Sequence, residues 1–295
     1  MRIVVCGSTG LIGSALTTHL AAAGHDVVRL VRTAPTGTDV GWDPASGALD
    51  AAVIDGADAI VNLSGASIGG HRWTDPYRRT LRDSRTAPTS LLADTIARVG
   101  GTGKVLLSGS AIGAYGDRGD EALTEASARG TGFLPDLVAA WEGSTAAAAR
   151  AGARVVHLRS GIVLDASGGA LARMLPPFRF GLGGRYGDGR QCMSWISLDD
   201  EVRAIVHLLS SNDEGPVNLT APHPVRNADF AATLGAVLRR PAVIPVPKFA
   251  FRLLLGRDLA ENLLFHGQQV VGSALVNAGF RWNHPSLREA LLAET

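Results

Sequence analysis

The first half of the chain alternates short apolar runs with longer amphipathic stretches. The apolar runs lie at 2–6, 26–31, 58–63, 104–109 and 154–159. They are rich in valine, isoleucine and leucine without polar alternation, which is typical of strands buried on both faces. Helical patterns lie near 11–23, 75–98 and 134–151. This order predicts right-handed βαβ units, and hence an α/β fold with a Rossmann-type, doubly wound parallel sheet.

The pattern changes after about residue 165. Residues 168–191 are rich in glycine and proline and long for a plain connection, which favours a binding loop or a substrate-side insertion. A short strand at 193–197 and a helix follow, with Asp199 or Asp200 as the expected helix cap. The remainder has a mostly helical pattern interrupted by prolines. We therefore expect two domains: 1–165, with sheet elements from 193–220, and a smaller, mostly helical substrate-side domain over 166–295.

The composition is that of an ordinary soluble globular protein. The 295 residues are 46% hydrophobic and 19% charged, enough for a substantial core. A net charge of +1 gives no field that would attract nucleic acid or an anionic membrane. No apolar segment reaches the roughly 18 residues of a membrane span. The chain enters a strand at once, which leaves no room for a signal peptide, so we expect a cytoplasmic protein.

Metal chemistry has little support in the sequence. Cys6 and Cys192 are far apart and show no metal-binding or redox spacing. The eight histidines are scattered and form no cluster of ligand spacing. We expect a small molecule as the partner, no metal, and a monomer or homodimer.

A glycine-rich turn directly follows the first predicted strand and opens a helix. Gly7, Gly10 and Gly13 form the pattern G-x-x-G-x-x-G. Glycines allow a tight turn and close approach of the backbone to a pyrophosphate, and the helix N-terminus offers free N–H groups. The spacing therefore predicts a dinucleotide site that also includes Thr9, Leu11 and Ile12; a turn made for packing alone is the alternative.

The end of the second strand distinguishes the two nicotinamide dinucleotides. An NAD site usually has an acidic residue there to accept from the ribose 2′-hydroxyl. This chain has Arg29 and Arg32, and no acid before Asp39. A guanidinium suits a 2′-phosphate through charge-assisted, bidentate hydrogen bonds. We therefore expect NADP(H) rather than NAD(H), with Arg32 as the ligand and Arg29 as a solvated charge at the strand edge.

The third strand ends in small residues. Leu63, Ser64 and Gly65 leave space beside the cofactor's ribose and diphosphate, and are predicted to contact it. Asn62 either contributes to this site or serves only to form the turn.

Seven segments together resemble a known family. They are GSTGLIG (7–13), NLSGA (62–66), VLLSGSAIGAYGD (105–117), LRSGIVLDASGGAL (158–171), GDGRQCMSWISLDD (187–200), GPVNLTAPHPVRN (215–227) and AGFRWNHPSLREAL (278–291). They resemble the extended short-chain dehydrogenase/reductases, the NAD-dependent epimerase/dehydratase group. Within that group, the chain is similar to the epimerase-like proteins with a C-terminal domain of unknown function. The resemblance spans nearly the whole chain and implies a Rossmann-type fold and NADP(H) binding.

The resemblance also implies a catalytic serine, tyrosine and lysine, of which only the serine is in place. Ser110 falls at the substrate-orienting hydroxyl and Ser108 at a cofactor contact, unless both only satisfy turn hydrogen bonds. The family's Tyr-x-x-x-Lys positions fall on Leu137 and Trp141. A free phenol titrates near about 10, so the lysine is needed to make it a useful base. Leucine has no proton to exchange, and tryptophan offers only an N–H donor.

Other residues are candidates for the remaining roles. Tyr115 lies just past the serine loop and is a candidate acid, with packing or substrate contact as the alternative. Arg85 either reaches a phosphate of cofactor or substrate or forms a surface salt bridge, and Glu142 points either to the pocket or to solvent. The remaining candidates are the backbone of Ser160, Gly161 and Ile162 near the nicotinamide carboxamide, and Gln191 and Trp195 on the substrate side.

Two functional hypotheses follow. The first is an NADP(H)-dependent epimerase or oxidoreductase with an atypical acid/base set, acting on an unknown small molecule such as a sugar nucleotide or a carbonyl compound. The second is a non-catalytic NADP(H)-binding sensor or scaffold.

Overall fold

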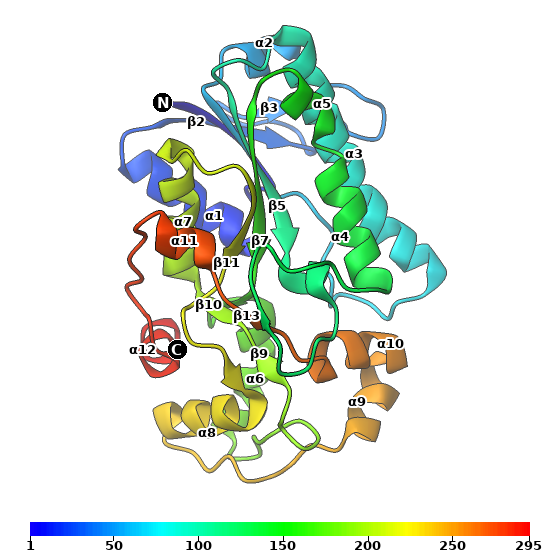
Figure 1. The fold of residues 1–295 in the computed structure, drawn as a ribbon, viewed down its shortest axis with the longest axis vertical. Coiled ribbons are helices and arrows are strands. Elements are labelled where there is room, and N and C mark those ends of the chain that lie inside the picture. Colours follow the sequence, from blue (N-terminus) through cyan, green and yellow to red (C-terminus); the bar gives the residue numbers. More distant parts are fainter.

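A seven-stranded, entirely parallel sheet forms the larger part of the protein, whose computed structural model describes residues 1–295 (Figure 1). Its order is β11-β7-β5-β4-β1-β2-β3. The strands are β1 (Arg2–Cys6), β2 (Asp26–Val31), β3 (Val40–Gly41), β4 (Ala59–Asn62), β5 (Val105–Ala111), β7 (Arg154–Ser160) and β11 (Gly215–Leu219). This confirms the predicted doubly wound sheet. The order reverses between β1 and β4, where ligands of such sheets bind at the carboxyl ends of the strands.

Helices cover both faces of the sheet, which explains the continuous apolar runs. Side chains alternate across a strand, so Ile3 and Val5 of β1 face one layer of helices and Val4 faces the other. The first layer comprises α1 (Leu11–Ala22), α7 (Leu198–Ser210) and α11 (Ser273–Asn277). The second comprises α2 (Ala51–Asp55), α3 (Asp75–Val99) and α5 (Ala146–Arg150). Figure 1 shows the two layers on opposite sides of the strands.

A second core lies beyond the carboxyl edge of the sheet. It is built on buried side chains that include Leu175, Phe178 and Phe230. Its elements are β8 (Ile162–Leu164), α6 (Gly169–Arg179), β10 (Trp195–Ser197), α8 (Asn227–Leu238) and α12 (Leu287–Glu294).

Short elements complete the chain. They are η1 (Ile112–Tyr115), β6 (Ala122–Leu123), α4 (Phe133–Gly143), β9 (Cys192–Met193), β12 (Val225–Arg226), α9 (Lys248–Leu255), α10 (Arg257–Ala260), the π-helical turn η2 (Glu261–Phe265) and β13 (Gln269–Val270). None of the helices combines the length and apolar character needed to cross a membrane.

The segment 168–191, predicted as a loop or insertion, contains a helix. Glycine and proline obscured an amphipathic pattern: Leu171, Leu175 and Phe178 follow helical spacing and are buried. The helix begins at Gly169, where φ is +66°, and ends soon after Pro176 and Pro177. Only the part after Arg179 remains irregular.

Two further boundaries differ from the prediction. The helix expected over 134–151 is two helices, α4 and α5, separated at Ser144 and Thr145. The Thr145 hydroxyl donates to the Glu142 carbonyl at 2.7 Å, a local bond that competes with helix continuation. Helix α7 is capped by Ser197 rather than by Asp199 or Asp200, since the Ser197 hydroxyl accepts from the Asp200 N–H.

Candidate functional site

The turn between β1 and α1 requires glycine at two of its three glycine positions. Gly7 has φ +74°, and a Cβ there would lie 2.6 Å from the Leu63 carbonyl oxygen. A Cβ on Gly13 would lie 2.2 Å from the Gly7 carbonyl oxygen, whereas Gly10 has more room. The turn is therefore compressed against the loop after β4, with its backbone open on the other side.

Unused hydrogen-bonding groups gather at this turn. No side chain caps the N-terminus of α1, so its first N–H groups and their partial positive charge remain free for an anion. The hydroxyl of Ser8 is buried without a partner. Thr9, Leu11 and Ile12 surround this helix start. The arrangement is that of an anion-binding turn.

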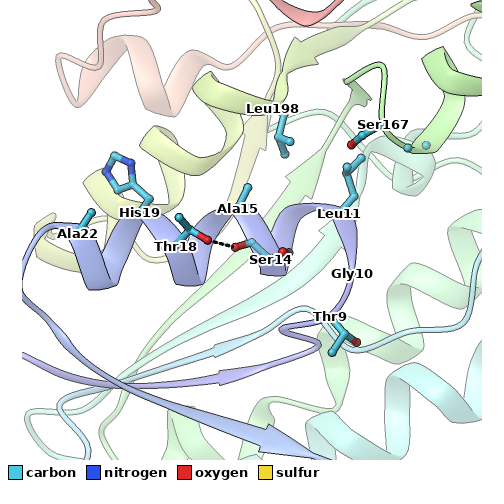
Figure 2. A pocket seen from close by; sticks show the side chains of 12 residues that line it. Thr9, Gly10, Leu11, Ser14, Ala15, Thr18, His19, Ala22, Ser167 and Leu198 are labelled. Carbon is cyan, nitrogen blue, oxygen red and sulfur yellow. Dashed lines mark hydrogen bonds between the residues drawn. The ribbon is translucent and has the colours of Figure 1, made fainter.

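A groove of about 910 Å³ begins at Thr9, Gly10 and Leu11 and follows the outer side of α1 (Figure 2). Its opposite wall is formed by residues 167–169 and Leu198. The groove meets the glycine turn at one end only. The remainder lies along α1, away from the carboxyl ends of β2 and β4.

The two arginines at the end of β2 have different environments. Arg29 forms a bidentate pair with Asp39, with both N–O distances 2.7 Å. Arg29 is thus a charge at the strand edge whose side chain is 41% exposed, with Asp39 as its counter-ion. Arg32 is exposed and forms no hydrogen bond or ion pair within the protein. The guanidinium available to a ligand at this strand end is therefore that of Arg32.

The loop after β4 is fixed by Asn62. Its side-chain amide donates to Thr89 at 2.9 Å and its oxygen accepts from the Ser64 N–H at 3.1 Å. Asn62 is fully buried, so it positions Leu63, Ser64 and Gly65 without being open to a ligand itself. The loop lies directly against the glycine turn.

A buried ionic network lies at the end of β5. The Ser110 hydroxyl donates to the Glu142 carboxylate at 2.7 Å. Arg159 donates to the same carboxylate through Nε at 2.8 Å and Nη2 at 3.0 Å, and Arg129 adds a further contact. Ser110 and Arg159 are neighbours in the register of β5 and β7, and α4 supplies Glu142. Burial by itself would raise the pKa of Glu142, but the bonds from Arg159 and Ser110 outweigh it and hold the pKa below its usual value.

This network was only partly visible in the sequence. Glu142 points neither to solvent nor freely into a pocket, because it is 4% exposed and bonded to Ser110. Arg159 lies at the end of the predicted strand 154–159, and no role for its side chain was predicted. A charged residue inside a strand predicted to be buried on both faces was the available signal that a buried partner exists.

The side chains of Tyr115 and Ser108 are enclosed by the protein. Tyr115 has no exposed surface; its hydroxyl donates to Asn218 at 2.7 Å and accepts from Arg159 at 2.9 Å. Burial raises the pKa of Tyr115, against the opposing effect of Arg159. The Ser108 side chain is also fully buried and bonds to the Gly109 carbonyl. These contacts favour packing for Tyr115 and turn hydrogen bonding for Ser108, the alternatives to a catalytic tyrosine and a serine contact to cofactor.

The turn after β7 is rigidly held. The N–H groups of Gly161 and Ile162 donate to the carbonyls of Leu219 and Ser194. These two N–H groups are therefore not available to a cofactor, and any contact at residues 160–162 must use other groups. The Ser160 hydroxyl is occupied as well, because it donates to Glu201 at 2.5 Å.

We expect Glu201 to make the stability of the protein depend on pH. It is fully buried, its Oε2 has no partner, and burial raises its pKa to about 8. The folded state then holds this proton up to about pH 8, whereas the unfolded chain loses it near the ordinary value of 4.5. The stabilisation that comes from holding this proton is complete below pH 4.5. It is lost as pH rises from 4.5 towards 8, by up to about 1.4 kcal/mol per pH unit.

We expect Glu201→Gln to remove this dependence, because glutamine has no proton to lose. Denaturant unfolding across this pH range should show the variant becoming progressively more stable than the parent protein as pH rises. Glu214→Gln, at an exposed position, is the matched control and should leave the profile unchanged. Parallel profiles for the parent and Glu201→Gln would contradict the assignment.

Trp195 and Gln191, the two residues expected on the substrate side, differ in their exposure to solvent. Trp195 is 1% exposed, belongs to the second core and donates to the His223 carbonyl, which favours a packing role. Gln191 is partly exposed, but its amide nitrogen donates to the carbonyls of Tyr186 and Leu264. It connects two segments of the C-terminal part.

Asp199, Asp200 and His284 bring three potential metal ligand atoms within 4.8 Å of one another. The Asp200 carboxylate already accepts from the N–H groups of Asn283 and His284 and pairs with Arg203. These bonds give the group a structural role in attaching the C-terminal segment to α7.

Family models match most of the chain. That of the NAD dependent epimerase/dehydratase family matches residues 3–220, and that of a domain of unknown function, DUF1731, matches residues 246–294. The chain belongs to the NAD dependent epimerase/dehydratase family. The match of both regions confirms the resemblance to epimerase-like proteins with a distinctive C-terminal domain.

Relatives cover the chain from end to end. An epimerase family protein of Mycobacterium bovis is 45% identical over 291 residues, covering 98% of this chain and 96% of its own. The human epimerase family protein SDR39U1 is 38% identical over 298 residues, covering 99% and 98%. A crystal structure of human SDR39U1 (isoform 2) with NADPH superposes with a TM-score of 0.90 at 35% identity, covering 100% of this chain and 99% of that one.

A nucleoside-diphosphate sugar epimerase from Corynebacterium glutamicum gives a TM-score of 0.80 at 34% identity, covering 100% of this chain and 58% of that chain.

Leu137 and Trp141, the residues expected at the family's tyrosine and lysine positions, are part of the core. Leu137 packs with Trp73, Leu81 and Leu259. Trp141 is 7% exposed and lies so close to β5 that a Cβ on Gly109 would be 2.9 Å from its ring. These contacts give both side chains a packing role. The family's usual proton-transfer pair has no equivalent on this face of α4.

Proposed function

We propose that this protein binds NADP(H), and the unpaired Arg32 at the end of β2 is the observation that carries this choice. The glycine turn would hold the pyrophosphate, with the unpartnered Ser8 hydroxyl as an additional donor. Arg32 would hold the 2′-phosphate, and Leu63 to Gly65 would flank the ribose. The crystal structure of human SDR39U1 with NADPH supports the proposal.

We further propose an NADP(H)-dependent oxidoreductase or epimerase reaction on a small molecule, with Ser110 orienting the substrate. The cofactor supplies a hydride donor or acceptor when bound. The single hydroxyl proton of Ser110 is directed at Glu142, which cannot donate in return while ionised. Ser110 can therefore accept a hydrogen bond from a substrate hydroxyl or amide, but it has no proton left for a carbonyl oxygen. The proton of the reaction would come from substrate or water.

A non-catalytic NADP(H)-binding sensor is the second candidate. It is favoured by the lack of a free acid or base. The hydroxyl protons of Ser110 and Tyr115 are donated to other side chains of the protein, and Leu137 and Trp141 provide no base. In this case the cofactor itself would be the ligand to which the protein responds.

Two measurements distinguish these functions. NADPH and NADH are first titrated against the protein by fluorescence, and the NADP(H) complex is then offered carbonyl compounds, alcohols and sugar nucleotides while nicotinamide absorbance is followed. An enzyme should turn over a hydroxyl-bearing substrate, and Ser110→Ala should lose about tenfold or more in rate while retaining NADPH binding. Ser210→Ala, at an exposed serine, serves as the control.

Tight NADPH binding without turnover across the panel would favour the sensor. Failure to bind either dinucleotide would exclude both candidates. Turnover that is equal in Ser110→Ala and the parent protein would remove Ser110 from the mechanism.

A further inference from the structure

Arg85 is a buried cation without a counter-ion. It is 9% exposed and belongs to no ion pair. Its Nη1 donates to the Leu81 carbonyl and its Nη2 to the Ala66 carbonyl, both at 3.0 Å. These partners are neutral and use two of the five N–H donors of the guanidinium. The expectation of a surface salt bridge is therefore wrong.

The contrast with Arg159 shows what Arg85 lacks. Arg159 is also buried, at 3% exposed, but it is bonded twice to the Glu142 carboxylate. No carboxylate pairs with Arg85, and burial lowers the pKa of Arg85 to about 10. A buried charge is costly unless it is paired, so an unpaired one indicates a partner from outside the chain.

Arg85 lies between the loop after β4 and the Ser110 end of β5. Its guanidinium lies 5.1 Å from the ring of Trp141, whose far edge meets Gly109, the residue before Ser110. A Cβ on Gly65 would lie 3.2 Å from the guanidinium carbon, so the loop after β4 leaves room for it. The Nε1 donor of Trp141 is also without a partner. A buried cation without a counter-ion and a buried N–H donor without an acceptor therefore occur on residues that are in contact.

The anion of this site differs from the phosphates already assigned. The glycine turn and Arg32 serve the end of β1 and the end of β2, whereas Arg85 contacts the loop after β4 and the helix beside β5. We propose that Arg85 binds an oxyanion of the substrate, a carboxylate or a phosphate, next to the Ser110 end of the site. This proposal rests on the proposed NADP(H) function, because it takes the substrate to lie beside the nicotinamide.

The test compares the NADPH-saturated protein with its Arg85→Met variant. Inorganic phosphate and malonate are titrated separately at constant ionic strength, with potassium chloride as the balancing salt, and thermal unfolding is followed. We expect one of the two anions to stabilise the parent protein, and Arg85→Met to weaken that anion by about tenfold or more. The anion that acts identifies the substrate group as phosphate or carboxylate. Arg82→Met, an exposed arginine one turn earlier on α3, should keep the parent affinity.

The unliganded variant provides a second readout. Methionine keeps the packing of Arg85 on Trp141 and removes the unpaired charge, so Arg85→Met should unfold at the same temperature as the parent protein or higher. Arg85→Lys, which retains a charge but not the planar fork, should bind the anion with intermediate strength.

Three results would overturn the proposal. One is the absence of stabilisation by either anion, and another is equal stabilisation of the parent protein and Arg85→Met. The third is a tenfold loss of NADPH affinity in Arg85→Met, which would assign Arg85 to the cofactor. If NADPH does not bind at all, the proposed function fails, and titrating phosphate and malonate against the cofactor-free protein still tests Arg85.

Discussion

Replacement of Glu142 by glutamine should destabilise the protein by about 3–5 kcal/mol. Glu142 and Arg159 are 4% and 3% exposed, and the carboxylate is the only acidic partner of Arg159. Glutamine keeps the shape of the side chain but removes its charge, so Arg159 remains buried without compensation. Urea-induced unfolding near neutral pH measures the loss.

Two comparisons isolate the buried pair. Glu121→Gln breaks the more exposed pair with Arg118 and should cost about 1 kcal/mol or less. The double variant Glu142→Leu with Arg159→Met removes both charges and should recover much of the stability, since neither charge is left unpaired. A loss in Glu142→Gln no larger than that in Glu121→Gln would show that the network contributes little.

We also expect the network around Glu142 to lose its stabilising effect at low pH. Since the folded pKa of Glu142 lies below its usual value, the stabilisation is present at neutral pH and is lost as pH falls through the folded pKa. The direction is opposite to that of Glu201, whose stabilising proton is lost as pH rises.

Arg32→Ala should reverse the preference between the two dinucleotides. A guanidinium bound to a phosphate contributes about 1.5–3 kcal/mol, so NADPH affinity should fall roughly 10- to 100-fold. NADH lacks the 2′-phosphate, and its affinity should change less than about threefold. Fluorescence titration of both dinucleotides measures the ratio.

Arg179→Ala is the matched control, because Arg179 is exposed on α6, away from β2. It should leave both affinities unchanged. An Arg32→Ala variant that weakens NADPH and NADH equally would show that the 2′-phosphate is recognised elsewhere.

The sequence was reliable where the signal is local. The glycine spacing acts within the first thirteen residues, and Gly7 and Gly13 are required by contacts inside that turn and with the adjacent loop. The Arg32 argument depends on one strand end. By contrast, Tyr115 was a reasonable candidate acid from its position after β5, and only the packing of β11 and β13 around it shows that it is enclosed.

Local patterns were enough to predict the parallel sheet and the cofactor turn, because buried strands and glycine turns are specified by neighbouring residues. The tertiary structure decided how the charged residues are used. Glu142, Arg159 and Ser110 come from α4, β7 and β5, and their contact depends on the strand register and on how the helix packs. Likewise, whether an arginine is paired, as Arg29 is, or left unpaired, as Arg85 is, depends on which distant side chains reach it.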